Sequence, residues 1–504
     1  MISKGKVKDL EELISRFSVE VVNKQFYSEI AEAFTKLIGG KFGSKKYDRT
    51  LVFNRTIDEK KYSEFGVRLI GRILFCWFLR EKKSDNGIAL IPNKFFDKET
   101  ILNSELYYNE ILEPLFFELL NTKINRRKNE FLEGEFRLIP YLNGGLFSPH
   151  PDDNYLYNPD KKTCADRVSI PNEWFLDLYQ TLSEYNFTVD ENTAYDIELS
   201  IDPEMLGRIF ENLLAEINPE TGENAKKNTG SFYTPRDVVD YMVDTSLFQY
   251  LKKETNIDDV ALKGLISYSK EDDLYVFNDF EKKSIIDALY KVTVYDPACG
   301  SGAFPIGMLQ KIVYILQELD PTAKMWLNKS TDNIDPIFKR EIENKFSVGS
   351  LNYIRKISVI QNSIFGSDIQ PIAVEISRLR CFLSLIIEEK VKDDEENRGI
   401  NPLPNLDFKF IIANSLVKLD NSAQMTLFEN IDNIKALKNV REEYFIADTS
   451  RRNELKLEFA NIQQNMLLES IQLFGKSPSK KYYQLSAWKP FANEPTDWFD
   501  KDWM

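Results

Sequence analysis

The pattern of hydrophobic and polar residues predicts a mainly helical first part of the chain. Residues 67–82, VRLIGRILFCWFLREK, carry apolar side chains around most of a helical circumference, which is typical of a helix buried inside a domain. Further helices are predicted at about 98–120 and 171–185, and the Asn-Gly-Gly of residues 140–147 predicts a sharp turn between them. Residues 1–190 are therefore predicted to form an α-helical N-terminal domain.

A polar, glycine-bearing stretch at residues 218–230 marks the predicted boundary between two parts of the chain. After it, GSFYTPRDVVDYMVDTSL predicts a helix that begins at a proline and has an apolar face through Val238, Met242 and Leu247. We therefore interpret residues 191–235 as a connecting helix and linker.

Strands alternate with helices beyond residue 291, which predicts a parallel, doubly wound sheet. Three segments have strand character: residues 292–296, 363–368 and 407–415. Residues 236–504 are thus expected to form an incomplete Rossmann-like α/β core, a parallel sheet with flanking helices. Helical insertions are predicted at about 320–360 and 430–473.

Composition and length narrow the class of protein. A chain of 504 residues exceeds one ordinary hydrophobic core, so two or three domains are expected. The most apolar run, residues 73–79, is far shorter than a membrane span, and the N-terminus lacks the apolar core of a signal peptide. The cysteines are widely spaced without a CxxC pair, which favours reduced thiols in a cytoplasmic protein: Cys76, Cys164, Cys299 and Cys381. A single histidine, His150, argues against a histidine-ligated metal site, and none is predicted.

The net charge of −14 argues against a protein coated in basic surface, but it leaves a local nucleic-acid contact open. Two basic stretches are candidates, GGKFGSKKYDR around Lys45 and GKSPSKKYYQL around Lys480. For each of them alone, a solvated loop is at least as good an interpretation.

The carboxyl ends of the predicted strands carry groups suited to a small ligand, because ligands of open α/β sheets bind outside these ends. The first strand ends at Asp296, and the turn Gly300-Ser301-Gly302 lets the backbone approach a ligand closely. The turn is not GxGxxG, since the next glycine is Gly307. A nucleoside cofactor without phosphates therefore fits better than a dinucleotide.

The second and third strand ends extend this site. Asp368 can accept hydrogen bonds from both ribose hydroxyls, Ile369 can pack on an adenine face, and Asn414 offers an amide to the adenine edge. An acidic strand end is often only a helix cap, and for Asp368 alone the two interpretations are about even. Taken together, the three ends predict S-adenosylmethionine, with its methionine tail and sulfonium near Asp296.

These segments resemble the motifs of amino-methyltransferases that act on DNA adenine. DPACGSGAFPIGML resembles motif I, GSFYTPRDVVDYM motif X, FGSDIQPIAVEISRLRCFLSL motif II with its helix, and NLDFKFIIANSL motif III. The order X, I, II, III is that of the gamma class. The resemblance and the strand-end argument assign these cofactor-binding residues: Thr234, Pro235, Asp296, Pro297, Ala298, Gly300, Ser301, Gly302, Asp368, Ile369 and Asn414.

Nearly the whole chain is similar to the large adenine-specific methyltransferases of type IIG restriction–modification enzymes and of bacteriophage-exclusion systems. VVNKQFYSEIAEAFTKL, PYLNGGLF and DPEMLGRIFENLL also look like parts of that group. The resemblance implies transfer of a methyl group from S-adenosylmethionine to the exocyclic amine of an adenine flipped out of double-stranded DNA. In the family, an Asn-Pro-Pro-Tyr motif holds that amine.

The sequence departs from this family in one decisive respect: neither Asn-Pro-Pro-Tyr nor Asp-Pro-Pro-Tyr occurs in it. We therefore assign no catalytic residue, and we expect this chain alone to be inactive and its sheet to end in an unpaired edge strand. A C-terminal half or a partner chain would supply the catalytic motif and target recognition. The 72 residues between Asp296 and Asp368 also exceed the usual about 20, and no nuclease constellation is recognisable.

Two alternatives to a site-specific adenine methyltransferase remain. The first is a non-catalytic S-adenosylmethionine-binding scaffold subunit of a phage-defence complex. The second, a nicotinamide-dependent oxidoreductase, is disfavoured by the glycine spacing. For the N-terminal helical domain, contact with the DNA backbone and a purely structural role are equally good interpretations.

Overall fold

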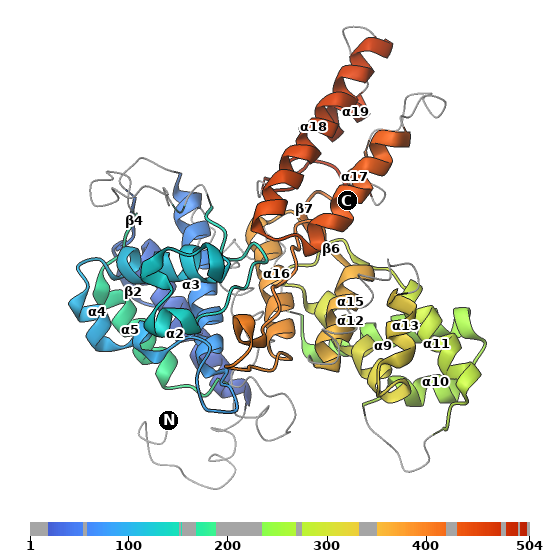
Figure 1. The fold of residues 1–504 in the computed structure, drawn as a ribbon, viewed down its shortest axis with the longest axis horizontal. Coiled ribbons are helices and arrows are strands. Elements are labelled where there is room, and N and C mark those ends of the chain that lie inside the picture. Colours follow the sequence, from blue (N-terminus) through green and yellow to red (C-terminus); the bar gives the residue numbers. More distant parts are fainter. Residues whose placement is uncertain are drawn as a thin grey trace. The chain divides into compact units, whose positions relative to one another are not determined.

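The computed structural model describes most of the chain: residues 19–53, 58–150, 153, 168–187, 234–268, 275–331, 350–419, 431–474, 480–491 and 494–500. The chain forms two compact units (Figure 1). The first combines Met1–Phe232 with Lys390–Asn401, and the second combines Tyr233–Glu389 with Pro402–Met504. Each unit is described by itself.

The first unit is built around helix α3 (Glu59–Glu81). Asp58 caps its N-terminus by accepting a hydrogen bond from the Lys60 backbone N–H at 3.1 Å. Every residue from Leu69 to Leu79 is buried, so the predicted buried helix is confirmed. Helix α2 (Val19–Ile38) packs against α3 where Gly66 leaves room, since a Cβ there would lie 3.0 Å from the ring of Phe34.

The predicted helix at 98–120 is interrupted at Ser104 and continues as π-helical turns. The predicted turn at 140–147 is confirmed, because Asn143, Gly144 and Gly145 all have positive φ. The unit also contains two short antiparallel ribbons, β1–β2 and β3–β4. Its remaining elements have these bounds: α4 Lys98–Asn103, the π-helical segments Tyr108–Leu112 and Pro114–Leu120, α5 Asn172–Ser183, β1 Gly40–Phe42, β2 Lys45–Tyr47, β3 Val52–Phe53 and β4 Val168–Ser169.

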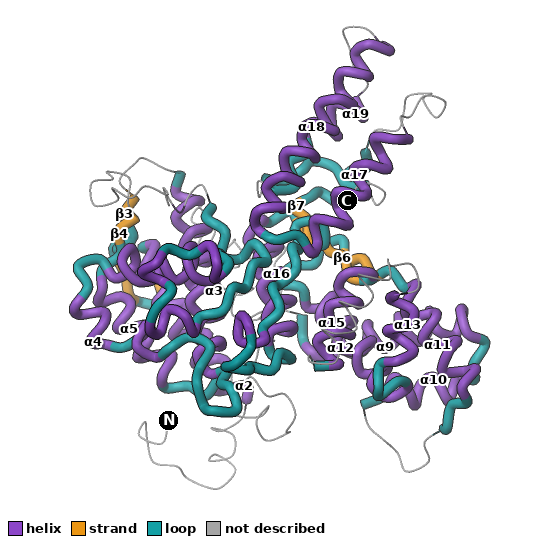
Figure 2. The backbone as a smooth tube through the Cα atoms, in the orientation of Figure 1, coloured by secondary structure: helices purple, strands orange, loops and turns teal. Residues whose placement is uncertain are grey.

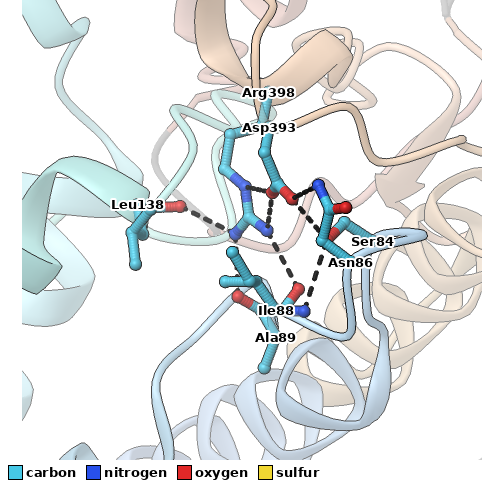
Figure 3. A network of polar contacts seen from close by, with 7 residues as sticks. All are labelled: Ser84, Asn86, Ile88, Ala89, Leu138, Asp393 and Arg398. Carbon is cyan, nitrogen blue, oxygen red and sulfur yellow. Dashed lines mark hydrogen bonds and ion pairs between the residues drawn. The ribbon is translucent and has the colours of Figure 1, made fainter.

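The segment Lys390–Asn401 belongs to the first unit although the second unit flanks it in sequence. Its buried residue Arg398 donates hydrogen bonds to the carbonyls of Ile88, Ala89 and Leu138 and pairs with Asp393 (Figure 3). Arg398 has a φ of 57°, which an arginine adopts only when surrounding contacts hold it there. We call residues Lys390–Asn401 the clasp.

The second unit contains a three-stranded parallel sheet in the order β5-β6-β7, with helices making up most of the rest (Figure 2). The strands are β5 (Val294–Asp296), β6 (Ile364–Asp368) and β7 (Phe410–Ile412). The predicted parallel pairing of these segments is confirmed, and the arrangement is compatible with a methyltransferase-like fold. The helices before α17 have these bounds: α9 Arg236–Thr255, α10 Asp259–Ile266, α11 Asp279–Lys291, α12 Ala303–Leu319, α13 Lys324–Thr331, α15 Leu351–Asn362 and α16 Pro371–Ile386.

The predicted apolar face of α9 is wrong by one residue at two positions. Val238 and Met242 are 43% and 47% exposed, whereas Val239 and Val243 are buried with Leu247. The reason is the packing of α9 on α12. A Cβ at Gly307 of α12 would lie 2.9 Å from Val239 Cγ1, so the valines at 239 and 243 occupy the contact.

A helical excursion lies at the predicted position, as α17 (Ile431–Ile446) and α18 (Thr449–Phe474), followed by α19 (Lys480–Ala487). These helices share an aromatic-rich core with the end of β7, in which Phe408, Phe459 and Trp488 are buried. The core fixes the base of the excursion beside the sheet.

The expectation of an unpaired edge strand needs a partial correction. Residues 494–500 run parallel to the end of β7, where the Thr496 N–H donates to the Ile412 carbonyl at 3.0 Å. The chain therefore covers part of its own β7 edge. At the other side, β5 pairs only with β6 among the described residues, and all three of its residues are half-buried.

Other predictions have simple outcomes. Cys76, Cys299 and Cys381 are buried free thiols, and Cys164 lies outside the described residues, as does the polar stretch at 218–230. Within the described part of the chain, none of the helices combines the length and apolar character needed to cross a membrane.

Candidate cofactor site

The glycine turn after β5 is held in a tight conformation by the neighbouring strand and helix. The Cys299 N–H donates to the Ser367 carbonyl of β6 at 3.0 Å, and the Ser377 hydroxyl of α16 donates to the Gly300 carbonyl at 2.9 Å. Gly302 has a φ of 84°, and a Cβ there would lie 3.0 Å from Ser377 Oγ. Both conformation and space therefore require glycine at position 302.

Asp368, at the end of β6, reaches across to the same turn. Its Oδ2 accepts a hydrogen bond from the Gly300 N–H at 3.0 Å, and its Oδ1 accepts one from the Gln370 N–H at 2.8 Å. The second contact closes a local turn just before α16, whose N-terminus has no side-chain cap. The first contact brings motif I and motif II residues together, as the strand-end argument requires.

Asp296 is the most unusual group of the site. Its Oδ1 accepts a hydrogen bond from the Ala298 N–H at 3.1 Å, while its Oδ2 is buried and has no hydrogen-bond partner among the described residues. Burial raises the pKa of Asp296, and the negative charge of Asp368 raises it further. Burial also raises the pKa of Asp368, against the opposing effect of its backbone donors.

These two carboxyl groups favour the binding of a positively charged or hydrogen-bond-donating group beside them. A buried acceptor without a partner costs about 1–3 kcal/mol, and a cationic donor ligand would remove this cost. The orphaned oxygen of Asp296 thus fits a ligand that carries an ammonium or sulfonium group, such as the methionine part of S-adenosylmethionine.

The residues that the sequence predicts to bind adenosine follow the carboxyl ends of β6 and β7. Ile369, which follows β6, is 61% exposed and offers an open apolar face. Asn414, which follows β7, uses its Oδ1 to accept from the Leu416 N–H at 3.1 Å, and its backbone N–H donates to the Thr496 carbonyl at 2.8 Å. Only the Nδ2 group of Asn414 has no hydrogen bond within the described part, so its available contribution is as a donor.

The other predicted residues take different positions. Ser301 is buried, and the Arg380 guanidinium holds its backbone carbonyl at 3.0 Å, so it supports the turn from within. Pro297 and Ala298 are exposed at the start of the turn. No hydrogen bond joins Thr234 or Pro235 to the turn within the described residues. The Thr-Pro pair is linked to it through α9, which begins after Pro235 and packs on α12.

A hydroxyl cluster that the sequence analysis missed joins the three strand ends. Ser367 Oγ lies 2.6 Å from the Tyr295 hydroxyl oxygen and 2.7 Å from Ser415 Oγ, while the Ser415 hydroxyl donates to the Pro297 carbonyl at 2.6 Å. The ring of Tyr295 also stacks on Phe499, with centroids 4.6 Å apart. Tyr295, Ser367 and Ser415 each adjoin a predicted site residue, and this was the available signal.

Metal ligation has no structural support in the described part of the chain, where no group of three or more His, Cys, Asp or Glu side chains could hold an ion. Burial raises the pKa of the Cys299 thiol, which favours the protonated form. The polar groups described at the site are carboxylates, backbone groups and hydroxyls.

Fold and site together place carboxylates, backbone groups and hydroxyls at the carboxyl ends of a three-stranded parallel sheet. Comparison with known proteins adds a relative, although no family model matches the chain. The chain is 29% identical over 396 residues to a Methanocaldococcus jannaschii protein named "Putative type II restriction enzyme and methyltransferase". The match covers 76% of this chain and 30% of that protein.

The solved structure of the type IIL restriction–modification enzyme MmeI in complex with DNA is also similar, at a TM-score of 0.39 and 16% identity. That match covers 71% of this chain and 36% of the MmeI chain. The chain thus spans about a third of the length of each of these proteins.

Proposed function

We propose that this chain supplies the S-adenosylmethionine-binding part of a site-specific DNA methyltransferase that modifies the exocyclic amine of adenine. The enzyme would act in restriction–modification or phage defence. The observation that carries the proposal is the buried, unpartnered Oδ2 of Asp296 beside the Gly300–Gly302 turn. The Asp368 bond to Gly300 ties this turn to the neighbouring strand end.

The residues of the chain would divide the work of binding among them. Asp296 accepts hydrogen bonds from the cationic end of the ligand, and the glycine turn lets the backbone lie against it. Asp368 has one described donor at each oxygen, which leaves acceptor capacity for ribose hydroxyls. Ile369 covers one adenine face, and Asn414 donates to the base edge. When bound, S-adenosylmethionine carries the activated methyl group on its sulfonium.

The proposed specificity for adenine rests on the order of the motifs and on the GSFYTP segment. The acceptor pocket would come from residues that this sequence does not contain, since no Asn-Pro-Pro-Tyr occurs in it. The same absence favours one second candidate, a cofactor-binding scaffold subunit without its own transfer activity.

The direct test is titration calorimetry of the 504-residue chain with S-adenosylmethionine, with NAD as the competing ligand class. We expect binding of the first and none of the second. Asp296→Asn and Asp368→Asn should each weaken binding. The matched control Asp279→Asn, at an exposed carboxyl at the start of α11, should not. Binding of NAD alone would refute the proposal.

A methyl-transfer assay on mixed-sequence duplex DNA tests the acceptor side. We expect no turnover by this chain alone, because the adenine-holding motif is absent from it. Sustained turnover would show that other residues of this chain hold the amine, and the division of labour proposed here would be wrong.

A further inference from the structure

The β1–β2 hairpin presents two lysines directly opposite each other. Its register pairs Lys41 with Lys46, beside the pairs Gly40–Tyr47 and Phe42–Lys45. Side chains of directly opposed residues project from the same face of a ribbon, with Cβ atoms about 4.5–5.5 Å apart. The two lysine side chains are thus neighbours on one face of a short ribbon.

The two faces of this hairpin differ in their environment. On the inner face, Phe42 and Tyr47 are half-buried, and both Lys45 and the Tyr47 hydroxyl bind Glu32 of α2. The Tyr47 hydrogen bond and then the Lys45 ammonium lower the pKa of Glu32, so this face holds its own counter-charge. By the alternation of a strand, Lys41 and Lys46 lie on the outer face.

The outer face has no such counter-charge. Lys41 and Lys46 are exposed, and no ion pair within the described part of the chain joins either of them to a carboxylate. The nearest acid in sequence, Asp48, is exposed and pairs with neither. Like charges directly opposite on a ribbon destabilise it, so this arrangement disfavours the free hairpin and favours one bound to an anion.

We propose that Lys41 and Lys46 contact the phosphate backbone of duplex DNA. The proposal rests on the proposed function for its choice of polyanion, and it adds a contact in the first unit, outside the cofactor site. The contact would be independent of base sequence, because lysine acts on phosphate as a point charge. Its local charge matters more than the net charge of −14 of the whole chain.

The hairpin tip is a tight turn with open space around its glycine. The two-residue turn contains Gly43 with a φ of 58°, and a Cβ at this position would meet nothing within 4 Å. The tip is therefore open, and the lysines on the flanking strands stand clear of the turn.

The test is fluorescence anisotropy of the 504-residue chain with a mixed-sequence duplex across a salt series. Lys41→Gln/Lys46→Gln removes two phosphate contacts, which should make the negative slope of log K against log salt shallower by about 1.8 and weaken binding by about 30-fold at roughly 0.15 M salt. Lys41→Arg/Lys46→Arg should retain binding. The control Lys83→Gln/Lys98→Gln removes the same charge from exposed positions of the first unit and should change neither quantity.

Thermal unfolding distinguishes a loss of DNA contacts from a loss of stability. Because the substitution removes the repulsion between the two lysines, the Tm of Lys41→Gln/Lys46→Gln should be unchanged or raised. The variant should also bind S-adenosylmethionine as the native chain does. If the native chain does not bind S-adenosylmethionine, the proposed function is wrong, but the DNA measurement still tests the hairpin contact. An unchanged salt slope in the glutamine variant, no DNA binding at all, or preference for phosphatidylserine vesicles over DNA would each overturn the hairpin proposal.

Discussion

The substitution Asp296→Asn separates the role of this carboxyl in binding from its role in folding. Asn has the same shape, and its amide oxygen can still accept the hydrogen bond that Oδ1 takes from the Ala298 N–H. What is lost is the negative charge on the buried, unpartnered oxygen. We therefore expect opposite effects on ligand affinity and on the stability of the free protein.

The affinity for S-adenosylmethionine should fall by about 10- to 150-fold, because a hydrogen bond to a charged group contributes roughly 1.5–3 kcal/mol. The Tm of the free protein should stay the same or rise, because the native carboxylate is desolvated without a compensating partner. Calorimetry measures the first quantity and differential scanning fluorimetry the second, with Asp279→Asn as the control.

The pH dependence gives an independent check. Burial raises the folded-state pKa of Asp296 above 3.8, so its contribution to stability is present at low pH and is lost as the pH rises through the raised value. The difference in Tm between Asp296→Asn and the native chain should therefore grow from acid to neutral pH. Affinity for the cationic ligand should decline as the pH falls through the same range. Parallel losses of Tm and affinity in the variant, or an unchanged affinity, would refute the reasoning.

Three further predictions concern the turn, the strand ends and the clasp. Gly302→Ala should lose about 1–2 kcal/mol of unfolding free energy through its left-handed φ alone, whereas Gly264→Ala, in a helix with open space around it, should gain about 0.5–1 kcal/mol in urea titrations. Ser415→Ala, which removes the donor to the Pro297 carbonyl, should weaken S-adenosylmethionine binding by about 0.5–1.5 kcal/mol in calorimetry. Arg398→Met should destabilise the first unit by about 1–3 kcal/mol, because the part-buried carbonyls of Ala89 and Leu138 lose their donor and Asp393 loses its cationic partner, and limited proteolysis should then cut that unit first; resistance equal to that of the native chain would contradict this.

The helices, the turn and the parallel order of the strands could be predicted from the sequence, whereas the packing face of a helix could not. The buried helix through residues 67–82 and the positive-φ turn at 140–147 follow from nearby residues alone. Val238 and Met242 were predicted to be buried but are exposed. The buried face of α9 is instead set by its contact with Gly307 of α12, which the local sequence of α9 does not reveal.

The candidate site follows the same division. Asp296 and Asp368 were identifiable because each ends a recognisable strand, and the structure ties both to the glycine turn. The hydroxyl cluster was not, because Tyr295 and Ser415 are 120 residues apart and only the fold brings their hydroxyl groups together. The sequence does not indicate the clasp either, because Arg398 stands in a polar stretch and its carbonyl partners are known only from the structure.

The clasp has a consequence for how such chains can be recombined. Because Lys390–Asn401 completes the first unit, the genetic module that encodes this unit is discontinuous. A crossover placed only near residue 232 would join a foreign N-terminal unit to the native clasp. In the native chain, Arg398 of the clasp donates hydrogen bonds to the carbonyls of Ile88, Ala89 and Leu138, and a foreign unit would have to supply the same acceptors. Functional chimaeras would therefore have to exchange Met1–Phe232 and Lys390–Asn401 together.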